Sequence, residues 1–256
     1  MVNKFIKLGA AVLIGLLLGS CSKPKEQATQ KVTFYADGIE TGKITRVTDH
    51  DAVIDLIENT YPTIKPTLYY SDTESFDITL GQSYDVKIGN WRVNYDSNPE
   101  SYAEVLTNSR LTLKPRLTID TFVDVQAGIS QYVLPVTVHS VAFVFCIDEI
   151  STVYYCGKNQ AAIDTKLNFQ VASGNYMVFF MDGEPGDRDI FEVRVVPSDV
   201  TRQETIFRFS YTVTTYNNTP VHKLVDGTYY VLHPEGVTEF TGSFSVDNPV
   251  WTCSLD

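Results

Sequence analysis

The four histidines are the first candidates for chemistry, because imidazole is the side chain most often used as a general acid or base near neutral pH. None of His50, His139, His222 and His233 lies in a recognised nucleophile motif. The chain has no Gly-x-Ser-x-Gly, no His-Glu-x-x-His and no glycine-rich phosphate loop. We therefore expect no catalytic residue, no cofactor and no enzymatic activity, and we expect His139 on a strand or at a turn.

Four carboxylates gather within eight residues between two strand-like segments of the C-terminal half. They are candidate ligands for calcium, which takes six to eight oxygens, and they are Asp182, Glu184, Asp187 and Asp189. Their spacing matches no EF-hand loop, and the intervening Gly183, Pro185 and Gly186 are residues that a hairpin turn needs in any case. A solvated turn is the alternative to a calcium site, and we assign no metal.

Aromatic side chains are the other candidates for binding, because sugar rings stack on exposed aromatic rings. The candidates are Trp91, Tyr95, Tyr154 and Trp251, together with the adjacent pairs Tyr69-Tyr70, Tyr154-Tyr155 and Tyr229-Tyr230. Neighbouring residues of a strand point to opposite faces, so one ring of each pair is available to solvent. Core packing and strand propensity explain the same residues equally well.

Three cysteines lie in the part of the chain that folds: Cys146, Cys156 and Cys253. A hairpin centred near Ser151 would set Cys146 opposite Cys156, close enough for a disulfide after a small adjustment. Two buried free thiols are the alternative. Cys253 is expected to stay a free thiol, since no fourth cysteine remains for it.

The N-terminus has the pattern of an export signal. Lys4 and Lys7 precede the uncharged apolar run Leu8 to Leu18, which is shorter than the roughly 20 residues of a membrane-spanning helix. Leu18-Gly19-Ser20-Cys21 then resembles the bacterial lipobox, in which the cysteine becomes the lipid-bearing first residue. We expect cleavage after residue 20, acylation of Cys21 by chains such as palmitate, and anchoring in the outer membrane, facing the cell surface.

Composition limits the partners of the mature protein. Residues 21–31 contain no aliphatic side chain larger than alanine and are expected to form a disordered tether. Removal of residues 1–20 takes two lysines and no acid from the 20 basic and 31 acidic residues, which leaves a formal charge of −13. That charge excludes nucleic acid as a partner, because nucleic-acid binding requires Lys and Arg to neutralise phosphates.

The folded part reads as an all-β protein. Short alternating runs lie between clusters of Gly, Pro, Asn and Asp, as β-sandwiches require. We expect strands at Val32–Ala36, Phe76–Leu80, Tyr84–Ile88, Leu117–Val125, Tyr132–Ile147, Tyr176–Met181, Phe191–Val196 and Ile206–Thr214. Asp51–Asn59 is the one segment with a helical pattern. Two tandem sandwiches are expected, residues 32–128 and 129–256, with Pro135 at an edge or a bulge.

A glycine, a tyrosine and a valine recur at three strand starts, with tyrosine and valine on the same face. Gly81, Gly174 and Gly227 each precede such a tyrosine. Glycine provides the positive φ of a turn, and the tyrosine can bury its ring while its hydroxyl reaches a turn backbone. The pattern indicates sandwich architecture and no binding site.

Two segments resemble the fimbrillin-like (Mfa-like) proteins of Bacteroidetes, whose lipoproteins also share the Ser-Lys sequence after the lipobox. Leu80–Val86 is similar to a strand of their first domain, and Val136–Phe145 to the strand that opens their second. The chain departs from the family at His139, where a basic residue is usual. The resemblance implies two transthyretin- or Ig-like sandwiches and a non-enzymatic surface protein in adhesion or fibre assembly. Its partners would be other fimbrial subunits or surface ligands, joined by β-strand addition. A glycan-binding surface lipoprotein serving polysaccharide uptake is the alternative.

The resemblance also implies a maturation step, in which a protease cuts after an arginine near the N-terminus and frees the first strand with its lipid. Arg46 is the first arginine of the sequence and follows the expected strand Val32–Ala36. It is therefore the candidate cleavage site. The alternative is an uncut chain that stays anchored through Cys21.

Overall fold

The chain folds into β-sheets throughout the part that the computed structural model describes, residues 28–37, 62–106, 108–146, 148–156, 165–167, 172–173, 176–183, 189–243 and 250–255. Side chains are described for all of these except residues 37, 172–173, 238–243 and 250–255. Within these ranges, no helix is long and apolar enough to cross a membrane. The expected helix Asp51–Asn59 lies outside them.

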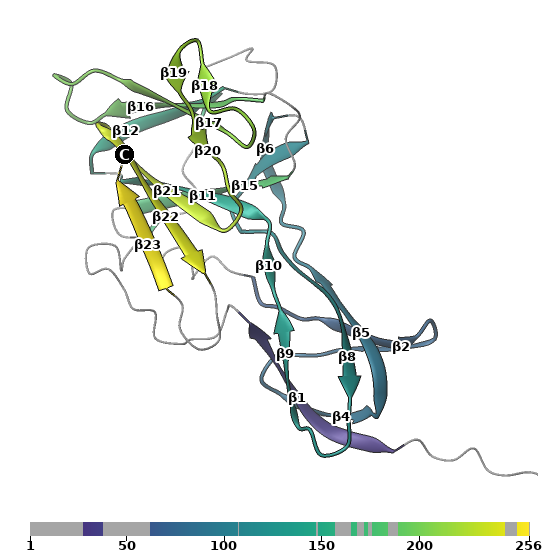
Figure 1. Cartoon of the computed structure of the whole chain (residues 1–256). Helices are drawn as coiled ribbons and strands as arrows, with labels where there is room; N and C mark the ends of the chain where they lie inside the picture. The colour runs from purple at the N-terminus through teal and green to yellow at the C-terminus, as the bar shows by residue number, and fades with distance from the viewer. Residues whose placement is uncertain are drawn as a thin grey trace, which may run out of the picture.

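Two sheets form the N-terminal sandwich, at the lower end of Figure 1. The first has the order β4-β1-β9, with bounds β1 Thr29–Asp37, β4 Ser83–Lys87 and β9 Gln131–Pro135. The second has the order β10-β8-β5-β2-β3, with bounds β2 Thr67–Ser71, β3 Glu74–Asp77, β5 Gly89–Asp96, β8 Leu117–Val125 and β10 Thr137–Val138.

Two larger sheets form the C-terminal sandwich. One has the order β23-β22-β21-β11-β15-β7-β6, with β14 paired to β15; its bounds are β6 Ser101–Leu106, β7 Ser109–Thr112, β11 Ser140–Cys146, β14 Ala172–Ser173, β15 Tyr176–Gly183, β21 Thr228–His233, β22 Gly236–Ser243 and β23 Val250–Leu255. The other has the order β13-β12-β16-β17-β20, with bounds β12 Ile150–Tyr155, β13 Thr165–Lys166, β16 Phe191–Pro197, β17 Thr205–Ser210 and β20 His222–Lys223. A hairpin of β18 (Thr215–Tyr216) and β19 (Thr219–Pro220) stands apart from both.

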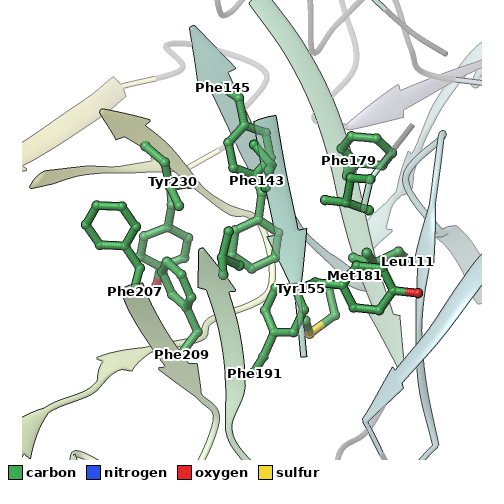
Figure 2. Packing of buried hydrophobic residues seen from close by; sticks show 14 of the residues in the cluster. Leu111, Phe143, Phe145, Tyr155, Phe179, Met181, Phe191, Phe207, Phe209 and Tyr230 are labelled. Carbon is green, nitrogen blue, oxygen red and sulfur yellow. The ribbon is translucent and has the colours of Figure 1, made fainter. Parts of the chain in front are cut away.

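The structure has two separate hydrophobic cores, one in each sandwich. In the C-terminal sandwich β11 and β15 are buried on both faces, and their sequences are almost wholly apolar. The C-terminal core is aromatic: the Phe143 ring lies 5.0 Å from Phe209 and 5.3 Å from Phe191 between ring centroids (Figure 2). The N-terminal core is smaller and centres on Trp91, which is 1% exposed.

The chain crosses between the sandwiches more often than a boundary at Gly128 allows. β6 and β7 precede that residue, yet β7 pairs with β15, β6 pairs with β7, and both pack in the C-terminal core. β9 and β10 follow it, yet they pair with β1 and β8 in the N-terminal sandwich. The two units are therefore not the sequential blocks 32–128 and 129–256, because strands from each block complete the sheets of the other.

Other expectations hold in part. β8 has the expected bounds Leu117–Val125, and Pro135 ends β9, an edge strand of its sheet. The expected long strand Tyr132–Ile147 is instead divided into β9, β10 and β11. β1 begins at Thr29, three residues before the expected start, so Thr29–Lys31 belong to a strand and not to the tether.

Candidate functional site

β1 is the middle strand of its sheet and has a different partner in each half. Its first half, Thr29–Thr33, pairs antiparallel with β4, and its second half, Thr33–Asp37, pairs parallel with β9 (Figure 1). Among the strands that the structure describes, neither neighbour pairs with the other, so β1 is what joins β4 to β9.

Backbone hydrogen bonds continue this pairing beyond the ladder. The carbonyl of Ala28 accepts from the N–H of Ile88 at 2.9 Å, and the carbonyl of Phe34 accepts from the N–H of Gly81 at 2.8 Å. The N–H of Thr33 donates to the carbonyl of Ser130 at 2.8 Å. If β1 left, backbone groups of β4, β9 and their loops would lose their partners, which is costly when they are buried and makes an adhesive edge when they are exposed.

The side chains of β1 fill the N-terminal core. Val32 and Phe34 are both 0% exposed, and the Phe34 ring stacks on Tyr132 of β9 at 6.0 Å between centroids. Full burial of such side chains stabilises a fold by about 1.5–3 kcal/mol each. Together they contribute roughly 3–6 kcal/mol, which is a large share of the about 5–15 kcal/mol that holds a typical domain folded.

Two tyrosines fix the strands on either side of β1. The hydroxyl of Tyr84 on β4 accepts from the N–H of Thr79 at 2.7 Å, and that of Tyr132 on β9 accepts from the N–H of Gln126 at 2.8 Å. The expected link between a tyrosine hydroxyl and a turn backbone is confirmed at Tyr84, where Gly81 has a φ of 78°. Tyr132 was missed by sequence reasoning, although Gly128, at a φ of 85°, precedes it. A glycine turn shortly before a strand tyrosine is the signal that both share.

The residues expected to be processed flank β1 in the sequence. Cys21 and Arg46 lie outside the described residues. β1 nevertheless lies wholly between their positions, so a cut after Arg46 would separate β1 and the residue expected to carry the lipid from the rest of the chain.

The two cysteines expected to face each other do not form a hairpin pair. Cys146 ends β11 and Cys156 follows β12, and these strands belong to different sheets. Ser151, the expected centre of the turn, lies within β12. Both cysteines are buried, and neither forms a disulfide.

The acidic segment has a structural role at its first residue. Asp182 is 2% exposed; its Oδ2 accepts a hydrogen bond from Arg110 Nε at 3.0 Å and lies 2.9 Å from Nη2 of the same guanidinium. Arg116 lies 3.8 Å from Oδ1 of Asp182 and also forms an ion pair with Asp96 at 2.8 Å. This cluster joins β15 and β7 of the C-terminal sandwich to the end of β5, and the Asp182 carboxylate is engaged by arginines within it. Glu184 and Asp187 lie outside the described residues, and Asp189 is half-buried. Among the residues that the structure describes, no group of three or more His, Cys, Asp or Glu could hold a metal.

The aromatic candidates do not form one binding surface. Trp91 is a core residue whose Nε1 donates to the carbonyl of Lys87 at 2.9 Å. Tyr95 packs against the same core, and burial raises its pKa. Tyr154 lies in the other sandwich under the guanidinium of Arg194, 4.2 Å from its ring centroid. The side chain of Trp251 is not described. Of the adjacent pairs, Tyr69 is 40% exposed beside a half-buried Tyr70, and Tyr154 is half-buried beside a buried Tyr155. Tyr229 and Tyr230 are both buried, against the expectation.

The histidines of the described ranges lie apart. His139 falls between β10 and β11, as expected for a turn, with its Nε2 2.8 Å from the Thr118 hydroxyl. His222 packs beside the Phe209 ring, and His233 contacts Glu149 at 3.2 Å through Nδ1.

No protein-family model and no curated protein sequence matches this chain. Solved structures of fimbrial and adhesion proteins are similar to it. A protein named as a cell adhesion protein from Bacteroides eggerthii aligns with a TM-score of 0.41 and 8% identity, over 91% of this chain and 97% of its own. A fimbrial assembly protein from Parabacteroides distasonis aligns with a TM-score of 0.38 and 11% identity, over 90% of this chain and 100% of its own. The tip fimbrial protein Mfa3 from Porphyromonas gingivalis aligns with a TM-score of 0.35 and 8% identity, over 75% of this chain and 92% of its own.

Proposed function

We propose that this chain is a lipid-anchored, non-enzymatic protein of the bacterial surface that takes part in adhesion or fibre assembly by exchange of its first strand. The observation that carries the proposal is the place of β1, which lies between β4 and β9 and pairs with both. The acylated Cys21 would hold the chain in the outer membrane.

The chemistry of assembly would be β-strand addition. A groove left by β1 would offer the backbone groups of β4 on one side and those of β9 on the other. An incoming strand would gain affinity from main-chain hydrogen bonds and specificity from the pockets that Val32 and Phe34 now fill. A neighbouring subunit is the partner that this mechanism requires.

Limited proteolysis of the folded mature chain with an arginine-specific protease tests the proposal. We expect cleavage at Arg46, followed by oligomers detectable by light scattering. The Arg46→Lys variant keeps the positive charge and removes the site, so it should stay intact and monomeric. Resistance of Arg46 while Arg188 is cut, or cleavage that yields only monomers, would overturn strand exchange.

Polysaccharide uptake is the second candidate function, and exposed rings on the N-terminal sandwich favour it. Tyr69 and Phe122 are exposed on one sheet by 40% and 68%. Deletion of the gene should then impair growth on a polysaccharide. Normal growth on all polysaccharides that the parent strain uses would reject this role.

A further inference from the structure

The outer face of the sheet β2-β5-β8 carries two exposed aromatic rings on either side of an arginine. Strand pairing places Tyr69 of β2 opposite Arg92 of β5, and Arg92 opposite Phe122 of β8. All three point away from the core, since their strand neighbours Leu68, Trp91 and Val123 are buried. We refer to Tyr69, Arg92 and Phe122 as the aromatic row.

The spacing of the row follows from the sheet. Adjacent strands lie about 4.8 Å apart, so the residues bearing the two rings, on β2 and β8, are roughly 10 Å apart with Arg92 between them. Asp120 accepts from Arg92 Nε at 3.0 Å and from Nη2 at 3.3 Å. A guanidinium has five N–H donors, so donors of Arg92 remain beyond these two bonds. The arginine is thus held in place and keeps hydrogen-bonding capacity toward solvent.

We propose that the aromatic row binds a neutral oligosaccharide. The two rings would stack on the apolar faces of sugar units along the chain. Arg92, Asp120 and the outward-facing Asn90 and Asn94 of β5 would bind the hydroxyl groups between those units. A sugar unit has apolar ring faces and polar hydroxyl groups, and the aromatic row offers a matching arrangement of two apolar rings with polar side chains between them.

Charge selects a neutral sugar over an acidic one. The same outer face bears the exposed carboxylates of Asp77, Asp96, Asp120 and Asp124. Arg92 pairs with Asp120 and Arg116 with Asp96, so two arginines face four carboxylates and the face stays negative. Anionic glycans such as polyuronates or sulfated chains would meet a repulsive field on this face.

The exposed area also favours a sugar over a protein. An aromatic side chain offers about 150–250 Å², so rings exposed by 40% and 68% present roughly 200 Å² between them. A stable protein interface needs about 800 Å² from each partner. A protein partner would also bury the Arg92–Asp120 pair at the centre of its contact, with a desolvation penalty that sugar hydroxyls would avoid.

The site is independent of strand exchange. β1 packs on the inner side of the same sandwich, whereas the aromatic row lies on the outer face of the opposite sheet. Sugar binding therefore holds or fails without regard to what happens at Arg46.

Isothermal titration of the full chain in detergent tests the proposal with cellohexaose, xylohexaose, mannohexaose and, as the anionic probe, hexagalacturonate. We expect at least one neutral hexasaccharide to bind and hexagalacturonate not to bind. Phe122→Ala and Tyr69→Ala should each weaken binding by about tenfold or more, as truncation of an aromatic contact residue commonly does. Val133→Ala is the matched control: Val133 is 49% exposed on β9, in the other sheet, and its loss should leave binding unchanged.

Three results would overturn the proposal. The first is the binding of none of the neutral probes. The second is binding of a neutral hexasaccharide that is unchanged in both Phe122→Ala and Tyr69→Ala, or binding of hexagalacturonate as strong as that of the neutral probes. The third is a dimer of this chain, measured by sedimentation, that Phe122→Ala abolishes, because the row would then be a self-association surface. Circular dichroism of each variant separates loss of the site from loss of the fold.

Discussion

Phe34 is the residue through which the importance of β1 can be measured most simply. Its side chain is 0% exposed at the centre of the strand, in contact with the Tyr132 ring of β9. Phe34→Ala removes the ring and leaves the backbone pairing in place. The change therefore isolates the side-chain contribution of β1 to the N-terminal core.

The expected cost follows from the burial. Replacing a buried phenylalanine by alanine costs about 3–5 kcal/mol, as lost transfer free energy plus a residual cavity. With a urea slope of about 2 kcal/mol per molar, a loss of 4 kcal/mol lowers the unfolding midpoint by about 2 M. Lys31→Ala on the same strand is the control, because Lys31 is exposed and its loss should change stability by less than about 0.5 kcal/mol.

Tryptophan fluorescence during urea unfolding is the assay. The chain has two tryptophans, so a Trp251→Phe background leaves Trp91 as the only reporter. Trp91 lies in the core that β1 covers, 4.9 Å from Tyr70 between ring centroids. If Phe34→Ala shifts the midpoint no more than Lys31→Ala does, β1 is not an integral part of that core, and the reasoning about its exchange fails.

Three further predictions concern the arginine–carboxylate cluster and Gly183, the residue next to Asp182. Asp182→Asn should destabilise the chain by about 3 kcal/mol in thermal unfolding, because it leaves partly buried arginines without their carboxylate; an unchanged Tm would contradict this. Gly183→Ala should cost about 3 kcal/mol in urea unfolding, because Gly183 has a φ of 127° and a Cβ there would lie 2.2 Å from the carbonyl oxygen of Asn108. Near-native stability of this variant would show that β15 and β7 move apart at no cost, against the prediction. The hydrogen bond from Arg116 holds the pKa of Asp96 in the folded chain below its ordinary value. The ionised Asp96 therefore stabilises the fold at pH values above its unfolded pKa, and this contribution is lost as the pH falls through the lower folded pKa. Asp96→Asn should therefore flatten the acid limb of a stability–pH curve, and an unaltered limb would refute the assignment.

Local structure could be predicted where alternation is regular. Leu117–Val125 alternates with period two and forms β8 with those bounds. Val32–Ala36 alternates likewise and lies in β1, with Val32 and Phe34 inward. In both cases the side-chain period fixes which face is buried, and this information is local to the strand.

Strand partners could not be predicted, because alternation says which face is buried and not against which strand. β6 and β7 precede Gly128 and still join the C-terminal sheet, whereas β9 returns to β1 across about a hundred residues of sequence. Cys146 and Cys156 were placed in one hairpin for the same reason, although their strands enter different sheets.

The aromatic residues show a second limit of sequence reasoning. Trp91 and Phe122 are both strand residues of aromatic type, yet Trp91 is 1% exposed and Phe122 is 68% exposed. Only the register of β5 against β8 decides that one faces the core and the other faces solvent. A shift of one residue would exchange the two faces. Residue type alone therefore pointed to Trp91, a core residue, as a ligand-binding ring and overlooked the exposed Phe122.

Peptide capture measures the central claim, exchange of β1, most directly. The mature chain is cut at Arg46 and mixed with a labelled peptide of residues 28–37, and native mass spectrometry follows the species formed. Strand exchange predicts one labelled peptide per chain, loss of the original N-terminal fragment and fewer oligomers, whereas a peptide with Phe34→Ala should bind far less. A cut chain that keeps its own fragment, takes up no peptide and stays monomeric would contradict the account.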